Sequence, residues 1–433
     1  MLIRNIKRNE FRRTEHPKDT IERIKKGFGD LGLTERIVEL ETHKNLWSVR
    51  LHIDSIRLAS NGKGTSKELA LASAYAELAE RFSAGMEPEI HIAPFRRLSV
   101  CDTKIYENVA YYKYMNDYRW SHQDNFKDVL KVEDMLIGYP FTKGQFEYAK
   151  LNSELLRHWV PGYSLVNNKK VYVPILFVKW ISSTNGLASG NTIEEAIIQA
   201  TCEIFERDAM IRYLKSGIKA PNIIQESIED NTINEILKYF RNNDIEVIIK
   251  DIGNGMYPVY AILTFNQLLS TSMIGYNTMK SGSSFDSNEA IIRCFTERMQ
   301  GTSFEFEKSE GEISDDLKND KHMSLFFKGV CPINLDKFKD GDNIDYIHNA
   351  INGTRLEIDA CIDIAKSFGT DMIVIDHTHP ILKFPTTRVI MPGLSDFTKW
   401  WDESSLTMDF MCKIQKEEDL YEKNLMRVLK TFN

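Results

Sequence analysis

The chain has 433 residues, 42% of them hydrophobic and 27% charged, which is typical of a globular protein. With 55 Lys and Arg against 62 Asp and Glu, the formal net charge is −7, so no global attraction to nucleic acid or to an anionic membrane is expected. No window approaches ~18 uninterrupted apolar residues, and the basic start MLIRNIKRNEFRRTEHP lacks the apolar stretch of a signal peptide. Six scattered cysteines without a CxxC pair favour a reducing compartment, and a cytoplasmic location is expected.

Both helices and strands are expected in the N-terminal part of the chain. Thr20 is predicted to cap a helix over about 20–31, in which apolar residues recur at helical spacing. Residues 46–60 alternate like a single strand and lead into the glycine turn SNGKGTS. A helix rich in Ala, Leu and Glu is predicted over 67–83, and 100–160 shows no clear period.

From about residue 171 onward, strands and helices alternate without a uniform βα repeat. VYVPILFVKW is predicted to be a buried strand, with Pro174 favouring an edge or a bulge, and it leads into the glycine turn STNGLASGNT. The other elements expected are strands at 246–252, 258–265, 371–376 and 388–393, helices at 193–215, after SGSSFDSNEA, at 356–368 and near 416–430, and a polar surface excursion at 300–350. Together they predict an α+β fold with mixed sheets packed against helices.

Three of the predicted helices share one pattern of carboxylates. Aligned on Ala70, Ala196 and Ala290, they read ELALASAYAELAER, EEAIIQATCEIFER and NEAIIRCFTERMQG. Seven residues after each alanine, and again three residues further on, stand Glu77 and Glu80, Glu203 and Glu206, and Glu297 and Gln300. A Gly/Ser turn precedes each helix, which predicts internal pseudo-repeats.

Carboxylates three residues apart on a helix project to one side, here next to an apolar stripe. Burying them is costly without positive charge, so carboxylates that converge from separate helices predict an oxygen-ligand cage for a hard cation such as Mg²⁺. A single ExxE is more often a solvated helix face, whereas three copies in one register favour a shared site. Arg81 and Arg207 follow the second carboxylate and are placed either to orient the carboxylates or to reach phosphate oxygens.

Other candidate features carry weaker signals. SNGKGTS places Lys63 ahead of a helix N-terminus, which favours an anion, but it lacks the Walker A spacing, and a plain helix-entry turn is the alternative. DHTHP at 376–380 places two His near an Asp without a third ligand nearby, so a loop or surface role is favoured over a metal site. Cys202 and Cys294 are expected to be small buried residues, because no His partner can be assigned to either.

Taken together, these segments resemble the YcaO family. The resemblance is carried by LWSVRLH…SNGKGTSKELALASAYAELAERFS, YVPILFV…STNGLASGNTIEEAIIQATCEIFERD, NEAIIRCFTERMQG and RVIMPGLSDF, in family order over about 46–397. It implies a YcaO-type fold, with 1–45 as an N-terminal lead segment that packs on the core and 46–433 as the YcaO catalytic domain. The sequence reads most like the founding bacterial member, without that protein's C-terminal extension.

The resemblance also implies a nucleotide site without Walker motifs, with ATP and Mg²⁺ as cofactors. The positions that would hold Mg²⁺ are Glu77, Glu80, Glu203, Glu206 and Glu297. The nucleotide-binding positions are Arg13, Thr20, Lys63, Glu77, Glu80, Asn191, Glu195, Arg207 and Arg293, and the catalytic ones are Glu203, Glu206, Arg207 and Glu297. Ala188 stands where the founding member has a serine, with Ser189 adjacent.

The implied activity is that of an ATP-dependent peptide-modifying enzyme that activates a backbone amide. A Cys, Ser or Thr side chain, or an external sulfide, adds to the carbonyl, ATP phosphorylates the oxyanion, and loss of phosphate gives an azoline or a thioamide. The last residues, EKNLMRVLKTFN, lack the prolines in which azoline-forming members often end, which favours a thioamide-forming or diverged member. The alternatives are an accessory or scaffold role in methylthiolation of a ribosomal protein or another modification, and a metal-dependent hydrolase that uses the same carboxylates.

The expected partner is a peptide or protein substrate, and neither nucleic acid nor a membrane is expected. A sulfur-delivery or substrate-presenting partner protein and a homodimer are both compatible with the sequence, which decides neither. The identity of the substrate and the choice between a thioamide and an azoline are not encoded in any of these patterns.

Overall fold

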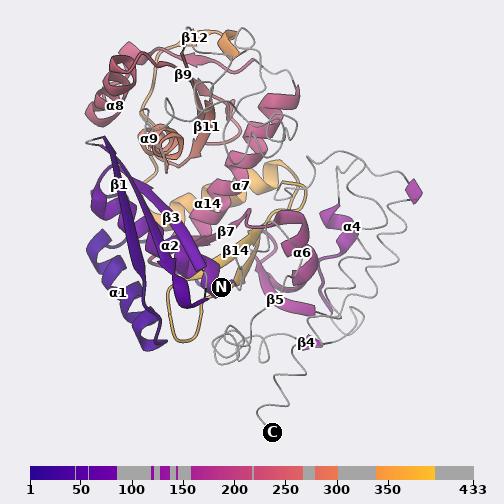
Figure 1. Cartoon of the computed structure of the whole chain (residues 1–433). Helices are drawn as coiled ribbons and strands as arrows, with labels where there is room; N and C mark the ends of the chain where they lie inside the picture. Colours follow the sequence, from indigo (N-terminus) through magenta and orange to yellow (C-terminus); the bar gives the residue numbers. More distant parts are fainter. Residues whose placement is uncertain are drawn as a thin grey trace.

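The computed structural model describes residues 1–43, 45–56, 58–84, 119–120, 127–136, 143–144, 158–216, 219–266, 278–300 and 338–394. In these residues three β-sheets pack against helices, as predicted for an α+β fold, and Figure 1 shows the sheets around the long helix α7 (Ile193–Ser216). No helix in the described ranges is long and apolar enough to cross a membrane. The predicted helix near 416–430, most of 100–160 and most of the excursion at 300–350 lie outside the described residues.

The first sheet is antiparallel and comes from the N-terminal part of the chain. Its order is β1-β2-β3, with β1 (Arg36–His43), β2 (Leu46–Ile53) and β3 (Leu58–Gly64). Helix α2 (Lys67–Ser83) packs on this sheet, and α1 (Pro17–Asp30) packs on α2. Apolar residues of both helices and of β2 and β3 share one core, which fixes α2 against the sheet.

The single strand predicted over 46–60 is wrong. The chain reverses at a short 3-10 turn, Asp54–Ile56, so that Leu58 pairs back with Ile53. This reversal contains no Gly or Pro, and the alternating pattern therefore runs through it unbroken. The predicted turn SNGKGTS is also mostly strand, because its first five residues pair with β2 and only Ser66 caps α2.

Helix α1 begins earlier than predicted. His16, and not Thr20, is the N-cap residue, because its ring nitrogen accepts a hydrogen bond from Lys18 N. Pro17 occupies the first helical turn, where its missing N–H would have no partner within the helix in any case. Thr20 lies inside the helix and is buried.

The second sheet has the order β11-β10-β9-β8-β12 and carries α8 (Asn231–Asn242) and α9 (Ser287–Arg298). Its strands are β8 (Asn222–Ile223), β9 (Glu246–Asp251), β10 (Val259–Phe265), β11 (Thr278–Ser283) and β12 (Asn343–Ile344). Described neighbours run antiparallel except β8 and β12, which are parallel. Strands β9 and β10 and helix α9 were expected from the sequence, whereas β11 and α8 were not.

The third sheet has the order β4-β5-β13-β14-β7, with β6 also paired to β5. Its strands are β4 (Arg119–Trp120), β5 (His158–Ser164), β6 (Lys169–Pro174), β7 (Leu187–Ser189), β13 (Ile373–Asp376) and β14 (Thr386–Ile390), and α4 (Val132–Met135) lies nearby in the chain. The strand predicted for VYVPILFVKW is confirmed only up to Pro174, where β6 ends. The rest of the prediction is wrong, because helix α6 (Ile175–Ser182) follows. A short run of apolar residues cannot distinguish a buried strand from a buried helix.

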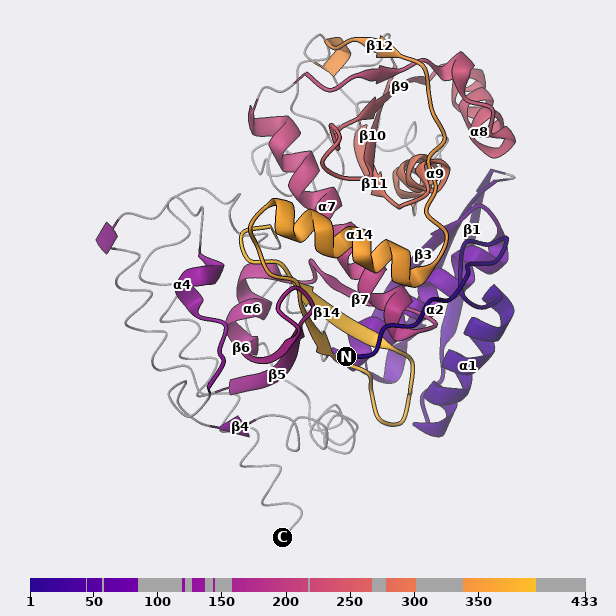
Figure 2. The same ribbon diagram turned by 180° about the vertical axis from the view of Figure 1, so that it is seen from behind.

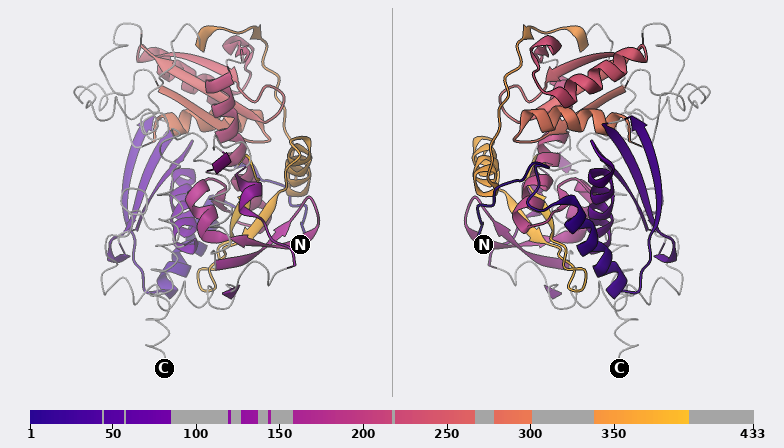
Figure 3. Two further views of the ribbon diagram at one scale, coloured as in Figure 1. Left: turned by 90° about the vertical axis from the view of Figure 1, so that its right-hand side faces the viewer. Right: turned by 90° about the vertical axis from the view of Figure 1, so that its left-hand side faces the viewer.

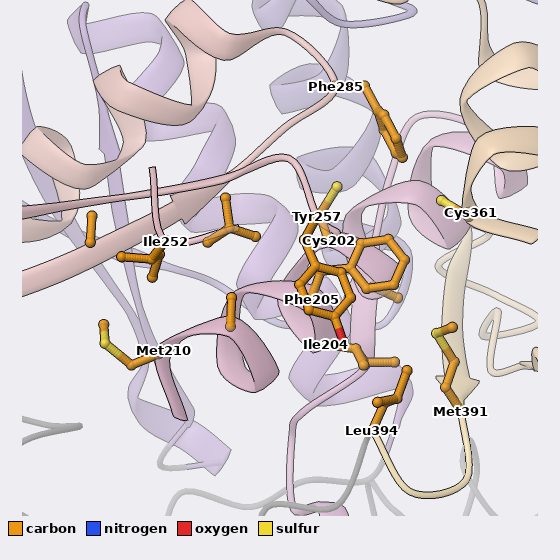
Figure 4. Close-up of a cluster of buried hydrophobic side chains, with 14 of the residues drawn as sticks. Cys202, Ile204, Phe205, Met210, Ile252, Tyr257, Phe285, Cys361, Met391 and Leu394 are labelled. Atoms are coloured by element: carbon orange, nitrogen blue, oxygen red, sulfur yellow. The ribbon is translucent and has the colours of Figure 1, made fainter. Parts of the chain in front are cut away.

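Helix α7 lies in the centre, against strands of both the second and third sheets and against α14 (Thr354–Ser367). Its buried side chains belong to the largest apolar cluster, where the Phe205 ring stacks on Tyr257 with 5.0 Å between centroids (Figure 4). Figure 3 shows the first sheet and α14 on opposite sides of α7. Helix α7 therefore joins the second and third sheets, while α9 contacts β2 and β3 of the first, so that a site can be built where the three meet.

Residues 1–16, called the N-terminal arm below, precede α1 without regular secondary structure and cross the ends of α7 and α14 (Figure 2). Ile6 N donates to Thr354 Oγ1 at 3.0 Å, and Thr354 N donates to Ile6 O at 3.1 Å. The boundary predicted at residue 45 falls in the hairpin between β1 and β2, so the predicted lead segment supplies one strand of the first sheet. The division into a lead segment and a catalytic domain stays a prediction.

Candidate nucleotide-binding site

A cavity of about 670 Å³ lies between the N-terminal arm, α1, α2, α7 and α9. All the predicted site residues except Glu206 line it, namely Arg13, Thr20, Lys63, Glu77, Glu80, Asn191, Glu195, Glu203, Arg207, Arg293 and Glu297. Segments that are more than 200 positions apart in the chain therefore contribute to one concave surface.

Close contact between a strand and the helix that follows it positions the three carboxylate helices. A Cβ on Gly62 would lie 2.0 Å from Ala70 O, one on Gly190 would lie 2.6 Å from Ala196 N, and one on Gly282 would lie 2.3 Å from Ala290 O. Each reference alanine thus sits directly on a glycine of the preceding strand or turn, where no side chain would fit. The carboxylates two turns further along each helix are then carried to the cavity, while the predicted internal pseudo-repeats stay a prediction.

The wall formed by α2 and α7 carries three carboxylates and two arginines. Arg81 Nη2 donates to Glu77 Oε1 at 3.1 Å, Arg81 Nε lies 3.7 Å from Glu80 Oε1, and Arg207 Nη2 lies 3.7 Å from Glu203 Oε1. Burial raises the pKa of Glu80 well above its ordinary value, a rise that Arg81 opposes and that Glu77 and Glu203 increase. Burial also raises the pKa of Glu203, against the effect of Arg207. The arginines therefore orient the carboxylates but do not offset the cost of burying them in ionised form.

The opposite wall is formed by β3 and α9. Lys63 Nζ contacts the Glu297 carboxylate and lies 3.3 Å from Gln300 Oε1, while Gln300 Nε2 donates to Asn61 O. Burial, together with Arg293 and Arg207 and against the attraction of Glu77 and Glu206, lowers the pKa of Lys63 to about 8. On this wall, Gln300 replaces the second carboxylate of the other two helices, and the Lys63 ammonium group of β3 contacts both Glu297 and Gln300.

Glu206 is the one predicted site residue that does not line the cavity. Three residues along a helix rotate a side chain by about 300°, so Glu206 points roughly 60° away from Glu203. Its Oε1 accepts a hydrogen bond from Ser281 Oγ on β11 at 3.0 Å. The spacing predicted that Glu203 and Glu206 project into one volume, whereas only Glu203 lines the cavity.

The predicted cage of protein carboxylates is not assembled in the described residues, where no group of three or more His, Cys, Asp or Glu side chains is arranged to hold a metal. Neither does DHTHP form such a group, and His377 and His379 are buried. Magnesium usually takes one or two carboxylates together with water and phosphate oxygens, so a complete protein cage is not required. Because burial disfavours the ionised forms of Glu80 and Glu203, a cation shared with the nucleotide would stabilise them, which fits a magnesium site.

The other end of the cavity is closed by hydrogen bonds around Asn191 and Glu195. Thr20 Oγ1 donates to Asn191 Oδ1 at 2.7 Å, and Arg23 Nη2 donates to the same oxygen at 3.2 Å. Glu195 Oε2 accepts from Thr14 Oγ1 at 2.6 Å and from Asn191 N at 3.2 Å. These contacts join α1, the arm and the first turn of α7.

Residues that the sequence reasoning missed also line this end. Arg13 Nη1 donates to Glu289 Oε1 at 2.7 Å, and Arg13 Nε lies 3.8 Å from Glu195 Oε1. Glu289 precedes Ala290 as Glu195 precedes Ala196, so the shared register already contained the signal. Arg8 and Glu357 line the cavity too, and no local pattern marks them.

The remaining candidates have structural contacts. Arg293 Nη1 donates to Ser283 O at 2.8 Å. Ser189 Oγ donates to Ala76 O at 2.7 Å, and it lies next to Ala188, the position at which the founding member of the family has a serine. Cys202 and Cys294 are buried as predicted, and burial raises the pKa of both thiols, that of Cys202 to about 11. Neither thiol is therefore activated as a nucleophile.

The structure is an α+β fold in which helices pack on three sheets, and carboxylate and basic side chains surround one cavity where these parts meet. This is the class of fold and site to which the ATP-dependent YcaO proteins belong. The YcaO family, described as a cyclodehydratase that binds ATP and Mg²⁺, matches residues 61–395, and the chain belongs to this family. ATP and Mg²⁺, the cofactors predicted from the sequence, are those of the family.

A relative and two solved structures illustrate the likeness. The Escherichia coli ribosomal protein S12 methylthiotransferase accessory factor YcaO is 25% identical over 399 residues, 88% of this chain and 65% of the relative. A heterocyclase in complex with substrate and cofactor has a TM-score of 0.65 at 18% identity, covering 92% of this chain and 54% of that one. YcaO from Methanopyrus kandleri bound with AMPPCP and Mg²⁺ has a TM-score of 0.59 at 18% identity, covering 90% and 95%. The two structures share the fold, and the chain spans less than two thirds of the E. coli relative.

Proposed function

We propose that this protein binds Mg-ATP in the cavity and uses it to phosphorylate a backbone amide oxygen of a peptide or protein. The observation that carries the proposal is the meeting of Glu77, Glu80, Glu203 and Glu297 with Arg207 and Lys63 around one cavity. The nucleotide analogue bound by the M. kandleri protein and the substrate bound by the heterocyclase support it, since both share the fold.

The residues present suit phosphoryl transfer to an amide. An amide oxygen is a poor leaving group and phosphate a good one, so phosphorylation of the adduct that forms when a side chain or sulfide attacks the carbonyl makes its collapse to an azoline or a thioamide favourable. When bound, Mg²⁺ would offset charge on the phosphates, and one or two of Glu77, Glu80, Glu203 and Glu297 would hold it together with phosphate oxygens. Arg207 and Lys63 lie on the two walls to attract the transferring group.

The test is Mg²⁺-dependent ATP binding and turnover by the wild type and by Glu203→Gln, with Glu22→Gln on the exposed side of α1 as the matched control. We expect the wild type and the control to bind ATP only with Mg²⁺ and to release phosphate when a competent peptide is added. Glu203→Gln should lose most of both. A wild-type protein without Mg²⁺-dependent ATP binding contradicts the proposal, and phosphoester hydrolysis without any nucleotide requirement would instead support a metal-dependent hydrolase.

A second candidate is an accessory or scaffold role, which is favoured by the name of the E. coli relative, an accessory factor of ribosomal protein methylthiolation. In that case the cavity still binds Mg-ATP, but no peptide stimulates turnover by the isolated chain. Turnover or product formation would then require a sulfur-delivery or substrate-presenting partner protein. Addition of the methylthiotransferase and its ribosomal substrate to the assay above distinguishes the two roles, and sedimentation tests whether the protein forms a homodimer.

A further inference from the structure

The N-terminal arm is attached to three different helices by arginine–carboxylate pairs. Arg4 holds Glu194 of α7 through Nε at 2.9 Å and Nη2 at 2.8 Å. Arg8 holds Glu357 of α14 through Nε and Nη2, both at 2.7 Å. Further along, Arg13 reaches Glu289 at the start of α9. The arm therefore connects α7, α14 and α9, two of which carry the carboxylates of the candidate site.

Of these pairs, Arg8–Glu357 is the most buried. The exposed fractions of the two side chains are 14% and 3%, against 57% and 0% for Arg4 and Glu194. Both oxygens of Glu357 accept from one guanidinium, the arrangement in which an arginine is held in the most defined orientation. A buried bidentate pair of this kind is a fixed point from which a segment without regular secondary structure can be oriented.

The Nη1 donor of Arg8 contacts the next turn of the arm. Arg8 Nη1 donates to Arg12 O at 2.9 Å, and Arg13 Nη1 donates to the same carbonyl oxygen at 2.9 Å. Arg12 has a φ of +57°, in the left-handed region that a residue with a side chain seldom adopts. From within the turn, Asn9 Oδ1 accepts hydrogen bonds from Phe11 N and Arg13 N, and Arg8 adds a contact from outside it. Arg8 thus supports the turn immediately ahead of Arg13 and Thr14.

Arg13 and Thr14 in turn hold two carboxylates in the cavity wall. Thr14 Oγ1 donates to Glu195 Oε2 at 2.6 Å, and Arg13 lies between Glu195 and Glu289, 3.8 Å from the first and 2.7 Å from the second. These carboxylates occupy the same place in the first turns of α7 and α9. The Arg13 guanidinium therefore bridges the first turns of α7 and α9, where Asn191 N also holds Glu195 and Ser284 Oγ also holds Glu289.

We propose that Arg8, through its pair with Glu357, is a positioning residue for the nucleotide site that holds the arm so that Arg13 and Thr14 fix Glu195 and Glu289 for Mg-ATP. The inference rests on the proposed function for its ligand. Arg8 does not act on the transferring group, and its effect passes through the Arg12 carbonyl and the residues that follow. Loss of Arg8 should therefore weaken Mg-ATP binding more than it slows turnover of bound ATP.

The experiment compares Arg8→Ala, Arg8→Lys and Glu357→Gln with Arg355→Ala, which removes an exposed arginine of α14 paired with Asp359. The readouts are the Kd for Mg-ATP, the KM and kcat for ATP, and hydrogen exchange of the amides of residues 9–14 without nucleotide. We expect Arg8→Ala and Glu357→Gln to raise Kd and KM on the order of tenfold, with kcat within about twofold of wild type and faster exchange in the arm. Lysine cannot hold both Glu357 oxygens and Arg12 O, so Arg8→Lys should rescue only part of the loss.

Several outcomes overturn the inference. Wild-type Kd and KM in Arg8→Ala contradict it, as does a loss no larger than that of Arg355→Ala. A fall in kcat as large as the rise in KM, with unchanged hydrogen exchange in the arm, would show that Arg8 has a different role. Should Arg8→Ala fail to fold, Glu357→Gln and Arg8→Lys carry the same comparison. A wild-type protein that does not bind Mg-ATP refutes the proposed function itself, a result that is distinguishable from a wild type that binds while the Arg8 variants bind equally well.

Discussion

Thr20 on α1 donates a hydrogen bond to Asn191 in the turn ahead of α7, with 2.7 Å between the two oxygens and both side chains buried. The two residues are 171 positions apart in the chain. Since α1 packs on α2 beside the first sheet and α7 packs on the second and third, this bond connects two sides of the cavity. Thr20 thus contributes to the site from inside a helix, and not from the cap at which the sequence placed it.

Replacing Thr20 with Val keeps the shape of the side chain and removes the donor. Asn191 Oδ1 still accepts a hydrogen bond from Arg23, so this buried acceptor keeps a donor. The loss of stability should therefore be about 1 kcal/mol. Thermal denaturation should show a lower midpoint for Thr20→Val, and titration should show weaker Mg-ATP binding. Thr20→Ser, which retains the hydroxyl, should remain close to wild type in both measurements. A valine variant as stable as the serine variant would show that this hydrogen bond contributes nothing.

The Glu80 carboxylate should lower the stability of the nucleotide-free protein while raising its affinity for Mg-ATP. It is 15% exposed and lies near Glu77 and Glu203, and Arg81 keeps its 3.1 Å hydrogen bond to Glu77 if Glu80 loses its charge. Glu80→Gln should therefore stabilise the nucleotide-free protein by about 1 kcal/mol while lowering affinity for Mg-ATP by at least tenfold. Glu68→Gln, on the exposed first turn of the same helix, is the control and should leave binding unchanged. Calorimetric melting with and without Mg-ATP measures both effects, and a destabilised Glu80→Gln would contradict the charge balance argued for this wall.

The helices that carry the carboxylates could be predicted from the sequence because their signals are local. Helix α2 has Ser66 as its cap and a run of strong helix formers, and its predicted and observed ranges are both 67–83. The helix predicted over 193–215 differs from α7 by one residue. The shared register then identified Glu77, Glu203 and Glu297, all of which line the cavity.

What the sequence could not supply depends on contacts between distant segments. Arg8 and Glu357 are 349 positions apart, and nothing near either residue indicates its partner. The orientation of Glu206 toward β11 depends on how α7 is rotated against the second sheet, which the helical period does not determine. Where the sequence misled, as at VYVPILFVKW, an apolar run satisfied both strand and helix, and tertiary burial decided between them.

The Glu289 carboxylate should make stability depend on pH. Burial alone would raise its pKa, but Arg13, Arg293 and Arg8 lower it from 4.5 to about 2. The folded protein then binds fewer protons here than the unfolded chain, so the contribution, roughly 3 kcal/mol, is fully present above pH 4.5 and is lost as the pH falls toward 2.

The variant Glu289→Gln should therefore melt well below wild type at pH 7, and the difference should narrow steadily between pH 4.5 and the acid limit of folding. Glu22→Gln on the exposed side of α1 provides the matched control, with a small difference at every pH. Melting curves recorded from pH 7 down to the lowest pH at which both proteins fold provide the comparison. A gap between Glu289→Gln and wild type that stays constant with pH would show that Glu289 is not held ionised by the arginines.

Gly62 controls how closely α2 approaches β3. A Cβ there would lie 2.0 Å from Ala70 O and 2.3 Å from Ala74 N, and because both are backbone atoms the helix as a whole would have to move. Glu77 and Glu80 would move with it, so Gly62→Ala should lower stability by several kcal/mol and abolish Mg-ATP binding in whatever fraction folds. Gly29, in the last turn of α1, has nothing within 4 Å of its Cβ position, and Gly29→Ala should stabilise the protein by about 0.5–1 kcal/mol with binding unchanged. Melting midpoints and Mg-ATP titrations of the two variants side by side separate a general effect of removing glycine from the loss of close packing. If Gly62→Ala folds and binds as Gly29→Ala does, the approach of α2 to its strand does not set the position of its carboxylates.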